Sequence, residues 1–383
     1  MKRQKPDVTL ENASYEQYVK MKGVFPGLCP IPYDEEAFRK NDIGRRNEEL
    51  HALYDTYAEN PLHPDLLRYW ADRGLKKELF DSDGKTGFEA PCAYSVFTPL
   101  SMDKNKKYAL IYFSHGGGHS IEWAETYGFN TQAAAERYII VYAQNGGRFN
   151  DAAPEEFPRI LESLKHKDYP IDWERVYAVG FSSGSEATAR IAAAYPHMVA
   201  AVGCLPGGIP FKNINFAADP TMNKLKKYRM PGIFIGGTLD KGNFPAQWMN
   251  QYAGYGLPVG SLENAVDSLN AWLTDVARAE NAEPLSVCEI MKLLNHSDDP
   301  VEREFGIRFP EPFQFCVQDA NWLGGDFYGE KHVPVMRWIR ACDVPHLVWE
   351  SQAELVWDYL KHFRRNIQSG ESIYDPVVCW GER

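Results

Sequence analysis

The chain has 383 residues, a length typical of one large α/β domain that carries insertions. Its formal net charge of −11 argues against nucleic acid and against an anionic membrane surface as partners, because both attract basic faces. The seven cysteines form no CxxC pair, the first residues contain no apolar signal-peptide core, and no apolar run reaches the roughly 20 residues that span a bilayer. These features predict a reduced, cytoplasmic protein without a membrane segment.

The first 88 residues predict a helical N-terminal extension. Apolar positions recur at helical spacing among many charges over residues 15–21, 34–57 and 64–79, and prolines separate these stretches. We therefore expect residues 1–88 to wrap around a main domain of residues 89–383.

From about residue 90 the pattern predicts short buried strands that alternate with helices. We expect strands at 94–97, 108–114, 138–142, 176–180, 199–205 and 232–236, and helices at 131–137, 155–165, 183–194 and 352–363. This alternation predicts a doubly wound, mostly parallel sheet. Residues 241–330 are rich in Pro, Gly and aromatic side chains and break the alternation, so we expect an insertion that caps the carboxyl edge of the sheet.

The sequence Gly180-Phe181-Ser182-Ser183-Gly184 fits the pattern G-x-S-x-G. Alone, this pattern also fits an inert Gly/Ser turn, but here an apolar strand runs into it and a helix of small residues leaves it, which is the setting of a nucleophile elbow. In such a turn the serine has strained backbone angles, and strand and helix approach so closely that only glycine fits at both flanking positions. The pattern predicts Ser182 as a nucleophile and the amide of Ser183 as an oxyanion donor.

A glycine-rich loop follows the predicted strand at 108–114, with the sequence His115-Gly116-Gly117-Gly118-His119. Its glycines leave backbone N–H groups uncovered, as in the loop that supplies the second oxyanion donor of esterases. We expect this donor to be the amide of Gly117, with Gly116 or Gly118 as alternatives, and His115 to contact the substrate. A metal site at His115 and His119 is disfavoured, because three glycines do not hold a helix and no HExxH glutamate is present. We predict no metal and no organic cofactor.

The acid and the base of a catalytic triad are predicted downstream of Ser182. Asp240 ends the sequence Gly236–Asp240 directly after an apolar strand, where a buried carboxylate would orient an imidazole. His346 precedes the final helix, where the base of such a fold lies, and the chain order Ser, Asp, His is the expected one. His332 is the rival base, and His362 is predicted to lie on the surface of the last helix.

Taken together, the motifs resemble those of the poly(3-hydroxybutyrate) depolymerase and feruloyl esterase-like branch of the α/β-hydrolases. The matching pieces are Ser114–Gly118, Asp172–Tyr177 before the elbow, Gly236–Asp240, and the pattern from His346 to Arg364. The likeness covers about residues 90–240 and 330–366, although Ser185 replaces a second glycine that many members carry. The resemblance implies an α/β-hydrolase fold and hydrolysis of a carboxylic ester through an acyl-enzyme.

The sequence says less about the substrate. Residues 241–330 offer seven aromatic side chains as pocket candidates: Trp248, Tyr252, Tyr255, Trp272, Trp322, Phe327 and Tyr328. We expect Trp248 and Trp322 to line the pocket, while most of the seven pack the core of the insertion itself. A small soluble ester is therefore the expected substrate, with a hydroxycinnamate ester as the refinement. A serine peptidase or acyltransferase of the same fold, and a non-catalytic binding protein of that fold, are the alternatives.

Overall fold

The structure is a computed structural model of the chain, and it describes residues 48–58, 60–80, 93–117, 121–144, 153–206, 222–238, 240, 262–280, 282–317, 320–344 and 348–377. Contacts between Cα atoms divide the chain into two compact units. The first unit holds the described residues from 48 to 203 and from 348 to 377, and the second holds those from 204 to 344.

The first unit is built on a sheet whose strand order is β1-β2-β4-β3-β5-β6. Its central strands are parallel, since β3 pairs in parallel with both β4 and β5, whereas β1 and β2 run antiparallel to their neighbours. The strands are β1 (Leu75–Phe80), β2 (Tyr94–Pro99), β3 (Tyr108–Ser114), β4 (Ile139–Ala143), β5 (Ile171–Phe181) and β6 (Ala201–Leu205), at which the chain passes into the second unit. A separate pair, β11 (Phe363–Arg365) and β12 (Ser372–Tyr374), forms a small antiparallel sheet.

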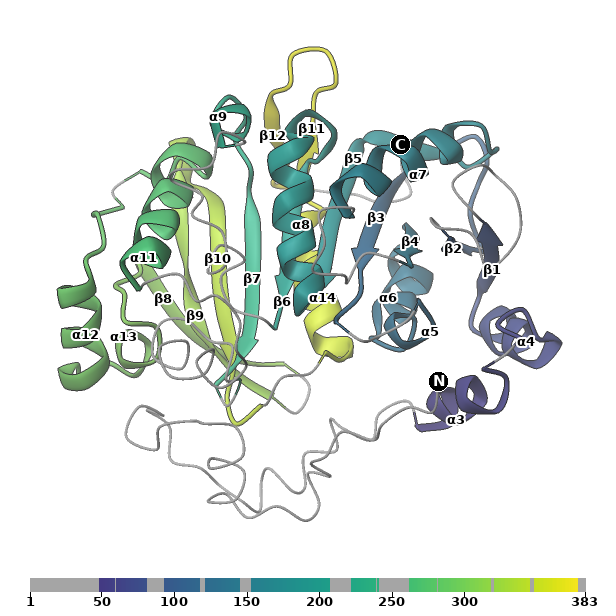
Figure 1. Cartoon of the computed structure of the whole chain (residues 1–383), viewed down its shortest axis with the longest axis horizontal. Helices are drawn as coiled ribbons and strands as arrows, with labels where there is room; N and C mark the ends of the chain where they lie inside the picture. The colour runs from purple at the N-terminus through teal and green to yellow at the C-terminus, as the bar shows by residue number, and fades with distance from the viewer. Residues whose placement is uncertain are drawn as a thin grey trace. The chain divides into compact units, whose positions relative to one another are not determined.

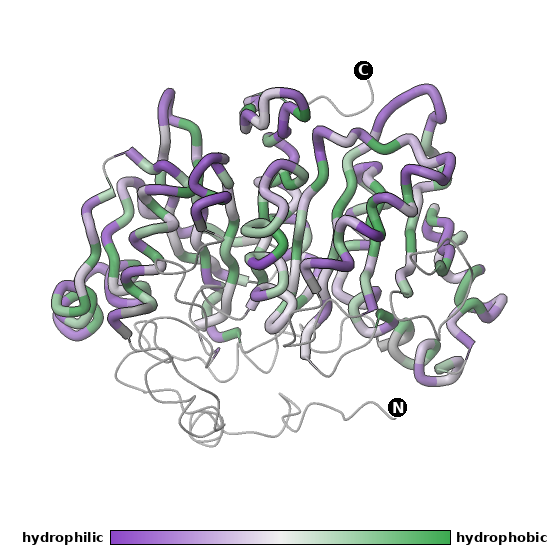
Figure 2. Tube along the Cα trace, turned by 45° about the horizontal axis from the view of Figure 1, so that its top comes forward, coloured by the Kyte–Doolittle hydropathy of each residue, from purple (hydrophilic) through white to green (hydrophobic). Residues whose placement is uncertain are grey.

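Helices cover both faces of this sheet. Successive side chains of a strand point to opposite faces, so a strand with only buried residues must be covered on both sides. Every residue of β3 is buried: Tyr112 packs edge-to-face on Phe157 of α7, and the next residue, Phe113, packs on Phe129 of α6. Figures 1 and 2 show this arrangement and the hydrophobic residues gathered along the strands. The helices are α3 (Glu48–Thr56), α4 (Pro64–Asp72), α5 (Ile121–Ala124), α6 (Phe129–Glu136), α7 (Ala153–Lys165), α8 (Ser183–Ala194), the 3-10 turn η3 (Pro196–Met198) and α14 (Glu350–Leu360).

The second unit holds strands in the order β7-β10-β9-β8. β7 (Gly232–Gly237) and β10 (Val333–Ala341) are parallel, and β9 (Ala320–Gly329) and β8 (Glu311–Val317) continue the sheet in antiparallel fashion. Aromatic pairs hold helices on the strands, such as Phe234 of β7 against Trp272. The helical elements are α9 (Met222–Leu225), α11 (Leu262–Ala271), the π-helical turn η5 (Trp272–Val276), α12 (Val287–His296), α13 (Pro300–Phe305) and the 3-10 turn η6 (Glu330–His332).

The doubly wound α/β architecture is confirmed: the chain has the sheet of an α/β-hydrolase fold, with parallel strands at its centre and helices around them. The predicted strand at 108–114 and the predicted helix at 183–194 have the observed bounds, and β5 is longer than expected because it begins at Ile171. Among the helices that the structure describes, none is long and apolar enough to cross a membrane.

Two segments differ from expectation. The predicted helix at 64–79 ends at Asp72, and Leu75–Phe80 forms the strand β1, so the N-terminal segment contributes to the sheet as well as to its surroundings. The boundary expected at residues 88 and 89 lies outside the described residues. In the expected cap of residues 241–330, the described part supplies helices and the strands β8 and β9, which extend the sheet through β10 instead of covering its carboxyl edge.

Candidate active site

Ser182 lies at the turn between the end of β5 and the start of α8. Its backbone angles are φ 56° and ψ −118°, a conformation that costs a non-glycine residue about 1–3 kcal/mol and is maintained only where the surroundings enforce it. The side chain of Ser182 is partly exposed, whereas those of Ser183 and Ser185 are buried, and Ser185 Oγ donates to Gly180 O at 2.9 Å. Of the three serines in this turn, Ser182 is the one presented outward.

The surroundings that enforce this turn are backbone atoms. A Cβ atom on Gly180 would lie 2.1 Å from Gly184 O, and one on Gly184 would lie 2.0 Å from Ser114 O and 2.6 Å from His115 O. The helix α8 therefore starts in direct contact with β5 on one side and with the end of β3 on the other. Both glycines are required for the reason predicted from the sequence, and the second also brings the glycine-rich loop next to the serine.

The loop after β3 presents its backbone beside this turn. Gly116 is buried and Gly117 is exposed, while residues 118–120 lie outside the described residues. The N-terminus of α8 also begins at Ser183, so its positive dipole end lies at the serine. The first unit thus brings Ser182 and Ser183, the predicted nucleophile and one predicted oxyanion donor, next to the start of the loop that carries Gly117, the other predicted donor.

His115 is placed differently from the expectation that it contacts the substrate. It is 3 % exposed, and its two ring nitrogens face backbone carbonyls: Nδ1 lies 2.8 Å from Gly116 O, and Nε2 lies 2.5 Å from Gln144 O. Because Gln144 directly follows β4, the imidazole ties the glycine-rich loop to the neighbouring strand. These contacts make His115 a brace of the loop.

The second unit carries Asp240, the predicted acid, and the segment before His346, the predicted base, after two adjacent parallel strands. Ala341, the last residue of β10, is in register with Gly237, the last residue of β7, and Thr238 N donates to Ala341 O at 2.9 Å. Asp240, fully buried, closes the turn after β7 through a bond from its N–H to Gly237 O at 3.0 Å. Since carboxyl ends of parallel strands meet at one edge, the turn with Asp240 and the segment leading to residue 346 leave the sheet side by side.

His346 itself lies outside the described residues. The structure does place its rivals. His332 is on the surface, stacked on Tyr328 at 3.9 Å and 3.3 Å from Glu311, and His362 follows α14 with Nδ1 2.8 Å from Asp375 O. The His332 side chain is thus engaged on the surface and the His362 side chain at the C-terminal segment, and His346 stays the predicted base.

Sequence reasoning gave no role to Thr238, and the structure supplies one. Its hydroxyl accepts the backbone N–H of Asp343 at 2.9 Å, which joins the turn with Asp240 to the segment that precedes His346. Thr238 is fully buried. The sequence signal for this role was the hydroxyl residue Thr238, which lies between the glycines and the acid in Gly236–Asp240.

The aromatic residues expected at the substrate are not confirmed as pocket residues. Trp322 is buried within the sheet, where its ring stacks on Phe315 of β8 at a centroid distance of 6.3 Å, and Trp272 and Phe327 are buried too. Trp248 lies outside the described residues. Of the seven, Trp272, Trp322 and Phe327 therefore pack the core of the insertion, whereas Tyr328 is half-buried and bonds to Glu311 through its hydroxyl.

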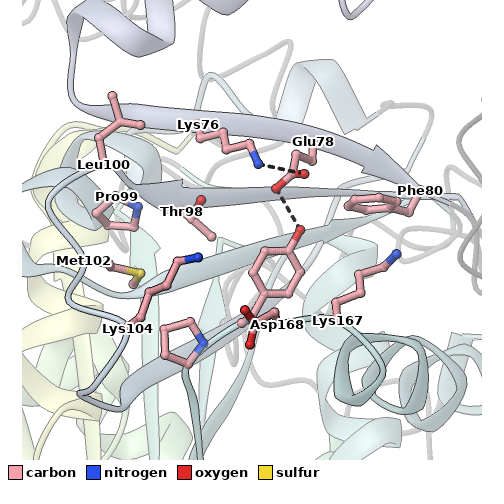
Figure 3. Close-up of a pocket in the computed structure, with 12 residues that line it drawn as sticks. Lys76, Glu78, Phe80, Thr98, Pro99, Leu100, Met102, Lys104, Lys167 and Asp168 are labelled. Carbon is pink, nitrogen blue, oxygen red and sulfur yellow. Dashed lines mark hydrogen bonds and ion pairs between the residues drawn. The ribbon is translucent and has the colours of Figure 1, made fainter.

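A cavity of about 430 Å³ lies in the first unit at the opposite ends of the strands from Ser182. It is bordered by the end of β2 and by the residues just before β5, and Figure 3 shows Lys76 paired with Glu78 across its wall. Glu78 also accepts the hydroxyl of Tyr169 at 2.9 Å. None of its twelve lining residues is Ser, Cys or His, so it offers no serine or thiol nucleophile with an imidazole base.

Among the described residues, no group of three or more His, Cys, Asp or Glu side chains could hold a metal ion. The elements that this part of the chain does provide are a strained serine on a strand–turn–helix, glycines enforced by backbone contact, and a glycine-rich loop beside it. They define the nucleophile elbow of an α/β-hydrolase.

Comparison with solved structures finds neighbours of low similarity. An acetyl xylan esterase from Aspergillus awamori superimposes with a TM-score of 0.45 and 11% identity, over 70% of this chain and 94% of that one. A feruloyl esterase module from Clostridium thermocellum, complexed with sinapinate, gives 0.43 and 14%, over 75% and 86%, and an S-formylglutathione hydrolase from Agrobacterium tumefaciens gives 0.33 and 15%, over 46% and 82%. No family model and no curated protein matches the sequence. The sheet order and the turn at Ser182 therefore carry the fold assignment.

We expect Gly184→Ala to destabilise the protein by about 2–4 kcal/mol, because neither Ser114 O nor the helix start can move away from a new methyl group. The matched control is Gly74→Ala, where no atom lies within 4 Å of the new Cβ and only the positive φ of 81° is strained, at about 1 kcal/mol. Urea unfolding measures both. Equal losses for the two variants would contradict the close contact between α8 and β3.

We expect His115→Phe to lower kcat about tenfold and to leave KM nearly unchanged, since it removes the brace of the glycine-rich loop and no substrate contact. Steady-state kinetics on a chromogenic ester measures both constants. A higher KM at constant kcat would instead assign His115 to substrate binding.

Proposed function

We propose that this protein is a serine carboxylic-ester hydrolase in which Ser182 is the nucleophile, His346 the base and Asp240 the acid. The observation that supports it most is the conformation of Ser182: a positive φ held between two glycines that have no room for a side chain. A glycine at position 182 would adopt the same backbone conformation without strain, so packing alone does not explain a serine there. The serine presents one hydroxyl at a turn that lies next to the start of the glycine-rich loop, whose amides would hold an oxyanion.

In the proposed reaction, His346 takes the proton of Ser182 Oγ as this oxygen attacks the ester carbonyl. The amides of Ser183 and Gly117 hold the negative charge of the tetrahedral intermediate, and the imidazolium then gives its proton to the departing alcohol. Water repeats the two steps on the acyl-enzyme and releases the acid and free Ser182. Asp240, buried after β7, keeps the imidazole in the required tautomer and stabilises its charged form.

The substrate that we propose is a small soluble ester, and hydroxycinnamate esters are the first class to compare with acetyl esters. The buried positions of Trp272 and Trp322 remove two of the aromatic side chains that favoured an aryl pocket. An aryl preference would therefore depend on Trp248 and its neighbours.

A fluorophosphonate probe tests the nucleophile. We expect covalent labelling of the wild-type protein at Ser182, read by peptide mass spectrometry, and no labelling of Ser182→Ala, with Ser185→Ala labelled like the wild type because its hydroxyl is buried against Gly180 O. No labelling of the wild type would favour a non-catalytic binding protein. Labelling that persists in Ser182→Ala would identify another nucleophile.

For a labelled enzyme, a substrate comparison separates the reaction types. Hydrolysis of an aryl ester but not of a peptide anilide would indicate an esterase and not a peptidase. Transfer of the acyl group to an added alcohol in preference to water would indicate an acyltransferase.

Asp240→Asn tests the acid. We expect kcat on a chromogenic ester to fall by about 10²–10⁴-fold, because the imidazole loses the carboxylate that orients it. Asp343→Asn is the matched control: it keeps the backbone N–H that bonds to Thr238, and we expect kcat to stay within about threefold. A larger loss of kcat in Asp343→Asn than in Asp240→Asn would assign the role of the acid to Asp343 instead of Asp240.

A further inference from the structure

Glu125 is a fully buried carboxylate just beyond the glycine-rich loop, directly after the short helix α5. Its Oε2 lies 2.7 Å from Nζ of Lys77 in β1, and both side chains are almost completely shielded from solvent. A buried ion pair gains little net stability, because desolvation of the two charges offsets most of their attraction. Stability alone therefore does not explain why Lys77 and Glu125 are buried as a pair.

The carboxylate contacts side chains of α3, β1 and β2, and α4 supports it through Tyr54. Ser95 Oγ of β2 donates to Glu125 Oε1 at 2.7 Å, and the Tyr54 hydroxyl of α3 donates to Oε2. Trp70 Nε1 of α4 donates in turn to the Tyr54 hydroxyl at 3.0 Å. Burial raises the pKa of Glu125, and the ammonium of Lys77 opposes that rise. One helix and two strands thus contact this side chain directly, and α4 contacts it through Tyr54.

The segment that carries Glu125 contacts both parts of the candidate active site. The ring of Tyr127 packs edge-to-face on Phe181, the residue before Ser182, at 5.3 Å, and against Phe113, the residue before Ser114, at 5.7 Å. Asn130 Nδ2 donates to the carbonyl of Glu125 at 3.1 Å and fixes the backbone between them. A displacement of Glu125 would be passed directly to Tyr127, and from there to the turn and to the root of the loop.

We propose that Glu125 is a positioning residue of the esterase, through which the N-terminal segment of residues 48–80 holds the oxyanion loop and the elbow in register. The inference rests on the esterase function proposed above. It gives the N-terminal segment a task in the reaction: α3, α4 and β1 supply Tyr54, Trp70 and Lys77, and these fix the segment on which the site is built.

The main test is the double variant Lys77→Met/Glu125→Gln, which removes both charges together. The glutamine amide keeps one oxygen that accepts from one of the Tyr54 and Ser95 hydroxyls, and its NH2 group can donate to the other. Paired removal leaves no uncompensated buried charge, whereas a single removal would cost about 3–5 kcal/mol. We expect a folded protein whose kcat on an aryl ester and fluorophosphonate labelling rate both fall about 10–100-fold, with KM within about threefold, because misplaced oxyanion donors affect the transition state more than binding.

Arg175→Met is the control for a purely structural effect. Arg175 is also buried and paired, 2.5 Å from Asp375, but it lies seven residues before Ser182 on β5, about 23 Å away along the strand. We expect this variant to lose stability and to keep its kcat. Ser95→Ala, which deletes the hydroxyl that contacts Glu125 Oε1, is the second network variant, and it replaces the double variant if that one fails to fold. We expect Ser95→Ala to lower kcat about three- to tenfold.

Each outcome has a distinct meaning. Wild-type kcat and labelling rate in a folded network variant, beside a wild-type protein that reacts at Ser182, would overturn the positioning role and leave the esterase function standing. Equal losses of kcat in Arg175→Met and in the network variants would also overturn it. A wild-type protein that does not react with the probe at Ser182 would overturn the esterase function, and the positioning role with it.

Discussion

The close backbone contact at the start of α8 is the constraint on which the rest of the site depends. Gly184 lies so near Ser114 and Gly180 so near Gly184 that strand, turn and helix have a single arrangement, and Ser182 must adopt a positive φ within it. This contact joins two stretches of chain that are about 70 residues apart, β3 with its glycine-rich loop and β5 with its serine. The tightness of the backbone therefore creates the geometry in which a hydroxyl and free amides can act together.

Polar groups stabilise the surroundings of this contact from two directions. His115 joins the loop to the end of β4, and Glu125 joins the following segment to β1, β2, α3 and α4. In the second unit, Thr238 does the same for the turn that ends at Asp240. In each case a buried side chain bonds to a neighbouring strand or to backbone near its end, so the loops at the carboxyl edge are held by the rigid part of the fold.

The sequence predicted the parts of the fold whose local pattern is strong. β3 and α8 have their predicted bounds, because seven buried residues in a row and a helix of small residues allow one assignment each. The strand β1 was missed, since Lys76 and Lys77 look like the charged face of a helix, and nothing in the local sequence shows that Lys77 meets a buried Glu125. β9 was missed because residues 241–330, which contain Gly324 and Gly325, were interpreted as an insertion rich in Pro, Gly and aromatic side chains. Gly324 and Gly325 are glycines because Trp338 O and the ring of Phe309 leave no space for a Cβ. The elbow followed from its spacing, whereas the bracing role of His115 depends on contacts with Gln144, which no motif contains.

The outer strand of the second unit has a consequence for behaviour at high concentration. β8 is the last strand in the order, and its residues from 311 to 316 are exposed or half-buried. Its second residue is Pro312, which has no N–H to donate, and its first is Glu311, which holds His332 and Tyr328 by its carboxylate. A neighbouring molecule that tried to add a strand there would meet a missing donor and a charged side chain, so this rim resists the growth of intermolecular β-structure.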